Sequence, residues 1–320
     1  MHLIKLLSLI TVLLVCIINA QCNYRHAELG LFPSVNFSST SHPSQIPIEN
    51  NGLLDGVTWN RVNSEFEKLT NEPVNGSEYK LILFLRHSEG WHNVAERKYG
   101  SKYWNDVESK KPQYLDSTLS DDGIVQAQQL QQRIIKDVTQ NKLRIDLILC
   151  SPFSRALQTA EIGLVHLWSN HRIPKISIEE ARESIGVHYC DKRHNRTYLT
   201  SKFPKVDFKR LISNEETLWT PDVRESDQDE FIRGRKVLDL IYNRREKRVI
   251  VPAHGGIINA ITASLGYAWN EGASGKTLPG DIKFISGFSM MNTEILPVIV
   301  RRDLKSFDSQ CTLIFFFSCL

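Results

Sequence analysis

Short apolar runs alternate with segments of helical periodicity through most of this chain. Continuous apolar runs of this length are typical of buried strands, and they cover residues 81–85, 144–150, 175–178 and 248–251. Apolar residues that recur every three or four positions predict helices over 122–136, 154–168, 228–247 and 256–265. Strands that alternate with helices are joined by right-handed crossovers, so we expect a mostly parallel sheet with helices on both faces, a three-layer α/β/α fold.

The same pattern divides the chain into a single domain with extensions at both ends. Residues 21–79 carry scattered Pro, Ser, Asn and Gly with weak periodicity, which predicts an irregular N-terminal arm. The domain proper is expected over 80–302, with an inserted rim or cap at about 187–227. Residues 303–320 form a C-terminal tail, interpreted as a terminal strand or an apolar extension.

The first residues resemble a secretory leader. Lys5 precedes an apolar run that ends shortly before Ala20, which predicts a signal peptide over residues 1–20 and a protein in the secretory pathway, outside the cell or at its surface. The alternative is an uncleaved membrane anchor, but the run is shorter than the roughly 20 apolar residues of a spanning helix. The C-terminal sequence CTLIFFFSCL has too short an apolar run for a lipid-anchor signal and lacks a prenylation cysteine, so no stable anchor is expected.

Cysteines and glycosylation sequons fit that route without fixing its details. Cleavage would leave an odd number of cysteines, so at least one thiol is free or pairs between chains; they are Cys22, Cys150, Cys190, Cys311 and Cys319. The sequons lie at Asn36, Asn75 and Asn195. The disulfide pairing, the glycosylated sites and the oligomeric state remain open at this point.

The overall charge argues against nucleic acid as a partner. With 39 basic and 36 acidic residues, the net charge of +3 provides no broad field for nucleic acid. The basic run CDKRHNR, residues 190–196, lacks interleaved aromatic residues, so we interpret it as a rim that selects the organic part of a substrate, or as a solvated loop.

Candidate chemistry collects where the predicted strands end. Arg86 and His87 follow the first strand, a serine-rich turn leads from the second to Arg155, Glu183 follows the third, and His254 follows the fourth. Ligands of such sheets bind beyond the carboxyl ends of the strands. Two guanidiniums, a histidine and a helix N-terminus opened by Gly255 suit a tetrahedral dianion, and the other histidine could then act as a nucleophile.

These residues lie in motifs that resemble a known family. RHSExxxN (86–93), SPFSRALQTA (151–160), ARESIG (181–186) and AHGG (253–256) are similar to motifs of the histidine phosphatase superfamily, also called phosphoglycerate mutase-like. HNVAE (92–96), GVHYCDKR (186–193), FPKVDF (203–208) and LWTPDVRE (218–225) resemble its plant and fungal phosphoglycerate mutase-like proteins. The resemblance covers roughly residues 53–300. The family usually has a glycine where this chain has Ser88, and a small residue where it has Gly90.

The resemblance implies a role for each site residue. His87 would become phosphorylated, while Arg86, Arg155 and His254 would hold the phosphoryl group. Asn93 would help complete the pocket. Glu183 would be the proton donor, with Asp191 as the next candidate for that role.

Hydrolysis of a small phosphomonoester through a phosphohistidine is the expected activity. No metal or other cofactor is expected, because arginines and His254 supply the positive charge. His87 and His92 are candidate metal ligands, but they lack HExxH spacing. His188, Cys190 and His194 are a second candidate set, but they lie in a cationic run that would repel a divalent ion. Two other functions stay open: a mutase that returns the phosphoryl group to a second hydroxyl, and a non-catalytic protein that binds a phosphorylated ligand.

Overall fold

A computed structural model describes residues 23–27, 29, 31, 51–265 and 290–303. The predicted signal peptide, the Asn36 sequon and the tail beyond residue 303 lie outside the described residues. Within the described part of the chain, no helix combines the length and hydrophobicity that crossing a bilayer requires.

One six-stranded sheet forms the centre of the molecule, in the order β1-β6-β2-β5-β3-β4. Four neighbouring strands are parallel: β2 (Glu78–Arg86), β5 (Arg248–Ala253), β3 (Leu147–Cys150) and β4 (Lys175–Ser177). Strand β6 (Ile295–Asp303) pairs antiparallel with β2, and β1 (Asn23–His26) pairs antiparallel with β6 at the edge of the sheet. The predicted α/β fold with a mostly parallel sheet is thus confirmed, and the antiparallel edge makes the sheet mixed.

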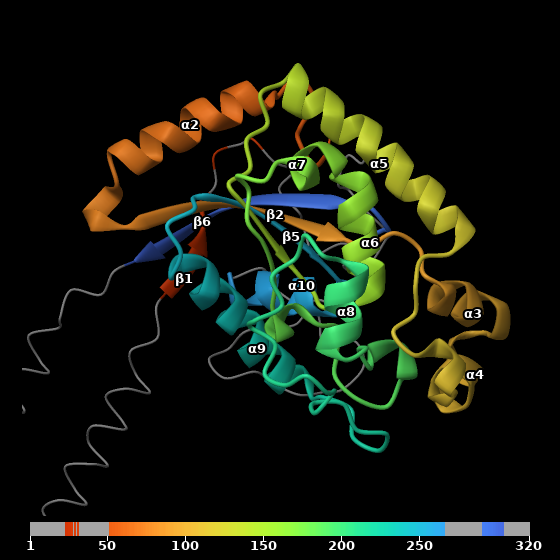
Figure 1. Cartoon of the computed structure of the whole chain (residues 1–320). Helices are drawn as coiled ribbons and strands as arrows, with labels where there is room; N and C mark the ends of the chain where they lie inside the picture. The colour runs from red at the N-terminus through yellow and green to blue at the C-terminus, as the bar shows by residue number, and fades with distance from the viewer. Residues whose placement is uncertain (1–22, 28, 30, 32–50, 266–289, 304–320) are drawn as a thin grey trace, which may run out of the picture.

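Helices cover both faces of this sheet (Figure 1). One face carries α2 (Trp59–Asn71), α5 (Asp121–Thr139), α6 (Ser154–Gly163) and α7 (Val165–Ser169). The other carries α9 (Asp227–Tyr242) and α10 (Gly255–Ser264). Successive side chains of a strand point to opposite faces, so Leu81, Leu83 and Leu85 of β2 enter the first core and Ile82 and Phe84 the second. Burial on both faces explains why this strand is a continuous apolar run.

Two predicted helices have different limits in the structure. The segment 154–168 is interrupted at Leu164, which separates α6 from α7. Helix α9 ends at Tyr242 instead of continuing to residue 247. The buried Lys80 accounts for the early end, because its ammonium donates to the carbonyls of Arg244 at 2.6 Å and Glu246 at 2.7 Å, which an α-helix would point elsewhere.

The N-terminal arm is more regular than predicted. Helix α2 begins after Thr58, whose hydroxyl accepts a hydrogen bond from Arg61 N, and it buries Trp59, Val62 and Phe66. The Trp59 indole donates to the Asp137 carboxylate of α5 at 2.7 Å. This corrects the prediction of an irregular segment: Trp59, Val62 and Phe66 recur at helical spacing, but the surrounding Pro, Ser, Asn and Gly of residues 21–79 obscured it.

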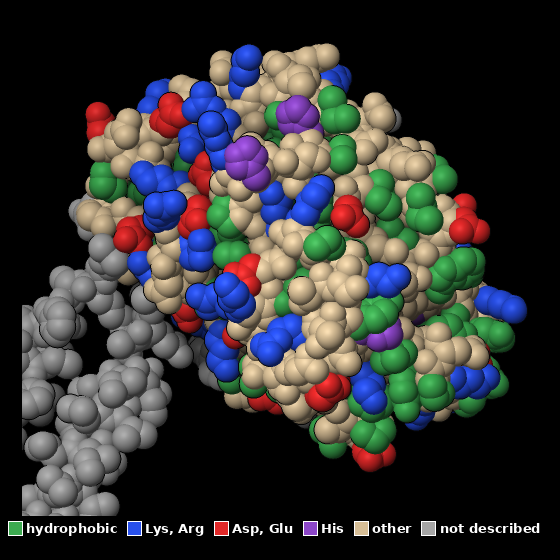
Figure 2. Space-filling model, in the orientation of Figure 1, with side chains coloured by type: hydrophobic (Ala, Val, Ile, Leu, Met, Phe, Trp, Pro, Cys, Tyr) green, Lys and Arg blue, Asp and Glu red, His purple; other side chains and the backbone are tan. Residues whose placement is uncertain are grey.

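The remaining helices are short. They are α3 (Trp91–Tyr99), α4 (Ser101–Asp106), α8 (Arg196–Lys202) and the 3₁₀ turns η1 (Val74–Gly76), η2 (Glu108–Lys110), η3 (Pro112–Tyr114), η4 (Glu179–Ala181) and η5 (Tyr189–Asp191). On the face drawn in Figure 2, basic side chains lie among acidic ones. Cys150 and Cys190 are buried free thiols.

Candidate active site

Two histidines meet because β2 and β5 are neighbours in the sheet. Arg86 pairs with Ala253 at the ends of these strands, and His87 N donates to the carbonyl of Ala253 at 3.0 Å. Each strand is therefore followed by a histidine at the same edge, and the centroids of the His87 and His254 rings are 5.0 Å apart. The expectation that strand ends bring these side chains together holds.

His87 has the geometry of a neutral nucleophile. Its Nδ1 lies 2.6 Å from the carbonyl oxygen of Ser88. A carbonyl oxygen only accepts, so the proton must be on Nδ1 and the lone pair on Nε2. Burial, together with the charges of Arg155 and Arg86, lowers the pKa of His87 well below its usual value. A neutral imidazole of this tautomer has the lone pair of Nε2 free.

His254 is held by the serine that follows β3. Its Nε2 lies 2.7 Å from the hydroxyl of Ser151. Its buried Nδ1 has no hydrogen-bond partner within the described part of the chain. Burial first, and then the positive charge of Arg155, lowers the pKa of this imidazole as well.

Arg155 is fixed on α6 by the segment 187–227. Its guanidinium donates to the carbonyl of Cys190 at 2.6 Å and to the carboxylate of Asp191 at 3.0 Å. Arg155, Asp191 and Arg193 are all buried, so this part of the basic run is not a solvated loop. The predicted rim forms a wall that holds the arginine in place.

Arg86 provides the second guanidinium. It donates to the carbonyl of Met290 and lies beside Gly255, the first residue of α10. The Nε atoms of Arg86 and Arg155 are buried without a hydrogen-bond partner among the described residues, as is Nδ1 of His254. Buried donors are almost always paired in folded proteins. Three unpaired nitrogens close to His87, to which Nδ1 of His92 adds a fourth, therefore indicate a site for an anion.

Glu183 lies beside the N-terminus of α10. Its carboxylate accepts a hydrogen bond from Ser184 N at 3.1 Å and a longer one from Gly256 N at 3.4 Å. Its negative charge acts on the guanidinium of Arg86. The carboxyl group is thus placed at the anion site, and it takes up one of the helix N–H groups that we expected to face the phosphate.

Asn93 is expected to help complete the pocket, and Ser88 and Gly90 stand where the family usually has a glycine and a small residue. In the structure, Asn93 Oδ1 accepts a hydrogen bond from Gly90 N at 3.0 Å and so caps the start of α3. Contact between Asn93 and a substrate stays a prediction. A Cβ at Gly90 would lie 2.6 Å from Nδ1 of His92, so glycine leaves room there for the His92 ring.

His92 and Ser151 are site residues whose roles the sequence analysis missed. The His92 ring is buried 5.4 Å from that of His87, and its Nδ1 has no partner in the described chain. Burial and the charge of Arg155 lower its pKa well below the usual value. His92 had been weighed only as a metal ligand. Its position five residues after His87 was the available signal.

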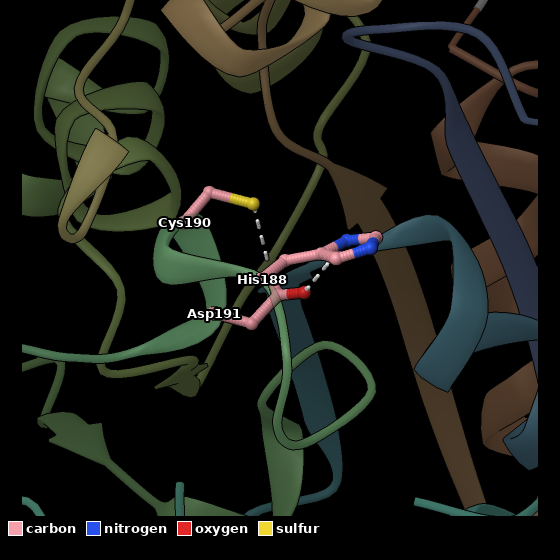
Figure 3. A group of neighbouring side chains, drawn as sticks. All are labelled: His188, Cys190 and Asp191. Atoms are coloured by element: carbon pink, nitrogen blue, oxygen red, sulfur yellow. Dashed lines mark hydrogen bonds and ion pairs between the residues drawn. The ribbon is translucent and has the colours of Figure 1, made fainter. Parts of the chain in front are cut away.

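A possible cation site was also tested. His188, Cys190 and Asp191 lie together, with their potential ligand atoms within 4.8 Å of one another (Figure 3). His194, the third candidate from the sequence, instead stacks on Tyr198.

The oxygens of Asp191 are already bound by Arg155 at 3.0 Å and by Arg224 at 2.8 Å. Burial and the Asp191 charge raise the pKa of the Cys190 thiol, which opposes the thiolate a metal needs. The group supports Arg155.

The fold and the site define an α/β protein whose anion site is built from histidine and arginine at the carboxyl edge of a sheet. The sequence profile of the histidine phosphatase superfamily (branch 1) matches residues 82–274. A "probable phosphoglycerate mutase" of Arthroderma benhamiae is 30% identical over 267 residues, which cover 79% of this chain and 72% of that protein. The chain therefore belongs to the histidine phosphatase superfamily, and its chemistry is phosphoryl transfer or phosphate-ester hydrolysis.

Two further comparisons involve proteins described as phosphatases. A "probable phosphatase" of Schizosaccharomyces pombe is 30% identical over 181 residues, which cover 55% of this chain and 74% of that protein. The structure of a mycobacterial glucosyl-3-phosphoglycerate phosphatase also matches, over 70% of this chain and 98% of the phosphatase chain. The two sequences are 22% identical, and the TM-score is 0.40.

Proposed function

We propose that this protein is a secreted phosphomonoesterase that acts through a phosphohistidine on His87. The observation that carries the proposal is the neutral His87 ring, with its proton on Nδ1, beside three buried nitrogens that lack a partner among the described residues. These nitrogens belong to Arg86, Arg155 and His254, and they suit the oxygens of a bound phosphoryl group.

The reaction proceeds in two displacements. Nε2 of His87 forms a bond to phosphorus as the bond to the ester oxygen breaks, and Glu183 gives its proton to the departing oxygen. Arg86, Arg155 and His254 stabilise the charge on the equatorial oxygens. Glu183 then takes a proton from a water molecule that attacks phosphorus, and the bond to His87 breaks. Inorganic phosphate leaves, and the protons balance over the cycle.

A mutase is the second candidate, and the descriptions of the relatives include both activities. A mutase must return the phosphoryl group to another hydroxyl and needs a supply of phosphoglycerate. The predicted leader over residues 1–20 favours hydrolysis, because an exported protein meets little glycolytic substrate. A non-catalytic binding protein would have no use for an acid at Glu183.

Trapping of the intermediate tests this proposal. After brief incubation with a phosphomonoester labelled in its phosphoryl group and an alkaline quench, acid-labile label should lie on His87. His87→Ala should carry no label and lose activity, while His171→Ala, which changes an exposed histidine, should behave like the wild type. Label on a serine would contradict the scheme. Activity should survive EDTA. The product separates the two activities: a phosphatase releases inorganic phosphate, whereas a mutase yields an isomerised phosphoglycerate.

Secretion has its own test. The mature chain is expected to start near Gln21 and to carry glycans that an endoglycosidase removes. N-terminal sequencing and the mass before and after digestion measure this. An intact Met1 on a cytosolic protein would contradict secretion and leave the chemistry untouched.

A further inference from the structure

A buried carboxyl group lies close to the half-buried Glu183. Glu230 projects from the first turn of α9, and the hydroxyl of Ser184 lies 3.2 Å from each of its oxygens. Gly256 shows how near the two carboxyl groups are. A Cβ on this glycine would lie 2.2 Å from Oε1 of Glu183 and 2.9 Å from Oε1 of Glu230. One glycine of α10 therefore makes room for both oxygens.

The surrounding charges leave Glu230 short of positive partners. Arg233 is the cation nearest to Glu230, at 3.5 Å, but it makes closer contacts of 2.8 and 2.5 Å with the carboxylate of Glu225. On the other side, Arg86 and Arg224 interact with the charge of Glu183. On the α9 side, one arginine thus serves two glutamates, and the less well paired of them is buried.

A fully ionised pair would be costly in this setting. Burial opposes the charge on Glu230, and two carboxylates at close range repel each other. Burial and the charge of Glu183 together raise the pKa of Glu230 to about 8, although Arg233 acts in the opposite direction. One proton is therefore expected to remain on the pair at neutral pH.

We infer that Glu230 holds this proton close to the Glu183 carboxyl group, and that Glu230 is a positioning residue that keeps the proton available to the acid of the reaction. The inference rests on the proposed function, in which Glu183 gives a proton to the departing oxygen. Once that proton has gone, the pair is doubly negative. Repulsion between the carboxylates then favours taking a proton from the attacking water, which restores the starting state.

The pH profile for an alkyl phosphate tests the role of Glu230. The wild-type rate should fall only near pH 8, where the pair loses its last proton. Glu230→Gln removes one carboxylate and should move this fall to lower pH by more than one unit. Glu230→Asp keeps the charge and should restore the wild-type limb. Ser184→Ala, the matched control, removes a hydrogen bond that lowers the pKa of Glu230 without changing charge, so it should not move the limb to lower pH. A limb that does not move in Glu230→Gln overturns the inference.

A measurement without substrate separates this inference from the proposed function. Infrared spectra of the wild type should show the absorption of a protonated carboxyl group that disappears near pH 8. Glu230→Gln should lack it at neutral pH. Absence of the absorption from the wild type at pH 7 would mean that the carboxyl pair holds no proton, and it would overturn the inference whatever the activity. Its presence in a protein that forms no phosphohistidine would sink the proposed function and leave the carboxyl pair standing. Circular dichroism confirms that each variant is folded.

Discussion

Two esters with different leaving groups can distinguish a general acid at Glu183 from a carboxylate that takes no part in the reaction. A positioned general acid contributes roughly 10² to 10⁴ in rate, and only when the departing oxygen needs a proton. An alkyl phosphate leaves as a strongly basic alkoxide, whereas nitrophenolate is stable without a proton. The position of Glu183 beside Gly256 and Arg86 suits the first of these tasks.

Glu183→Gln should therefore slow hydrolysis of an alkyl phosphate by about 10² to 10⁴ and affect the nitrophenyl ester much less. Steady-state rates on both esters measure the difference. His87→Ala, which removes the nucleophile, should abolish both reactions. An equal loss on both esters in Glu183→Gln would mean that the residue binds substrate or supports the structure, and the donor would have to be sought elsewhere.

Asp191, the alternative donor from the sequence, is unsuited to that role in the structure. Burial opposes its ionisation, but Arg224 and Arg155 outweigh burial and hold the pKa of Asp191 below its usual value. A carboxylate that binds two guanidiniums has no proton to give. Its contact with Arg155 makes it a support for the phosphate site.

At the scale of elements, the segment 187–227 and helix α6 act together. Turn η5 presents Cys190 and Asp191 to Arg155, which lies in the first turn of α6. At Ser154, the residue directly before Arg155, the Asp116 carboxylate accepts hydrogen bonds from the backbone N and the hydroxyl, at 2.8 and 2.7 Å. The insertion therefore orients an arginine that belongs to another element.

Asp191→Ala should weaken both the site and the fold. Removal of one partner of a buried ion pair costs about 3–5 kcal/mol, because the remaining charge stays buried without compensation. We expect a lower free energy of unfolding, by urea titration, and a lower kcat/KM for every phosphomonoester. Asp222→Ala changes an exposed acid of the same segment and serves as the control. Unchanged kinetics in a folded Asp191→Ala protein would contradict the orienting role.

At the scale of the whole molecule, the buried Glu230 couples stability to pH. Its folded-state pKa of about 8 lies above the ordinary value of 4.5. A raised pKa stabilises the folded protein fully below pH 4.5, and this contribution is lost as the pH rises through about 8. In the wild type, the free energy of unfolding should therefore contain a term that falls over this interval.

Glu230→Gln should remove that term, because glutamine does not titrate. Thermal or urea unfolding of both proteins at several pH values measures it as the difference between the two stability curves. The difference should change steadily between about pH 5 and pH 8. A constant difference would mean that Glu230 has no raised pKa in the folded protein.

The sequence by itself determined the parallel strands, the main helices and the residues at the strand ends. Those elements are defined by local patterns: the apolar run of β2 is buried on both faces, and the carboxyl ends of parallel neighbours must share one edge, which brings His87 and His254 together. The leader and the sequons are likewise sequence features, and secretion stays a prediction.

Only the tertiary structure decided which polar residues act on these side chains. Asp191 contacts Arg155 from 36 residues away along the chain, and Glu230 lies beside Glu183 only because α9 packs on α10 and Gly256 leaves space. Burial and the approach of distant charges set the pKa of a carboxyl group, and neither follows from the pattern around the residue.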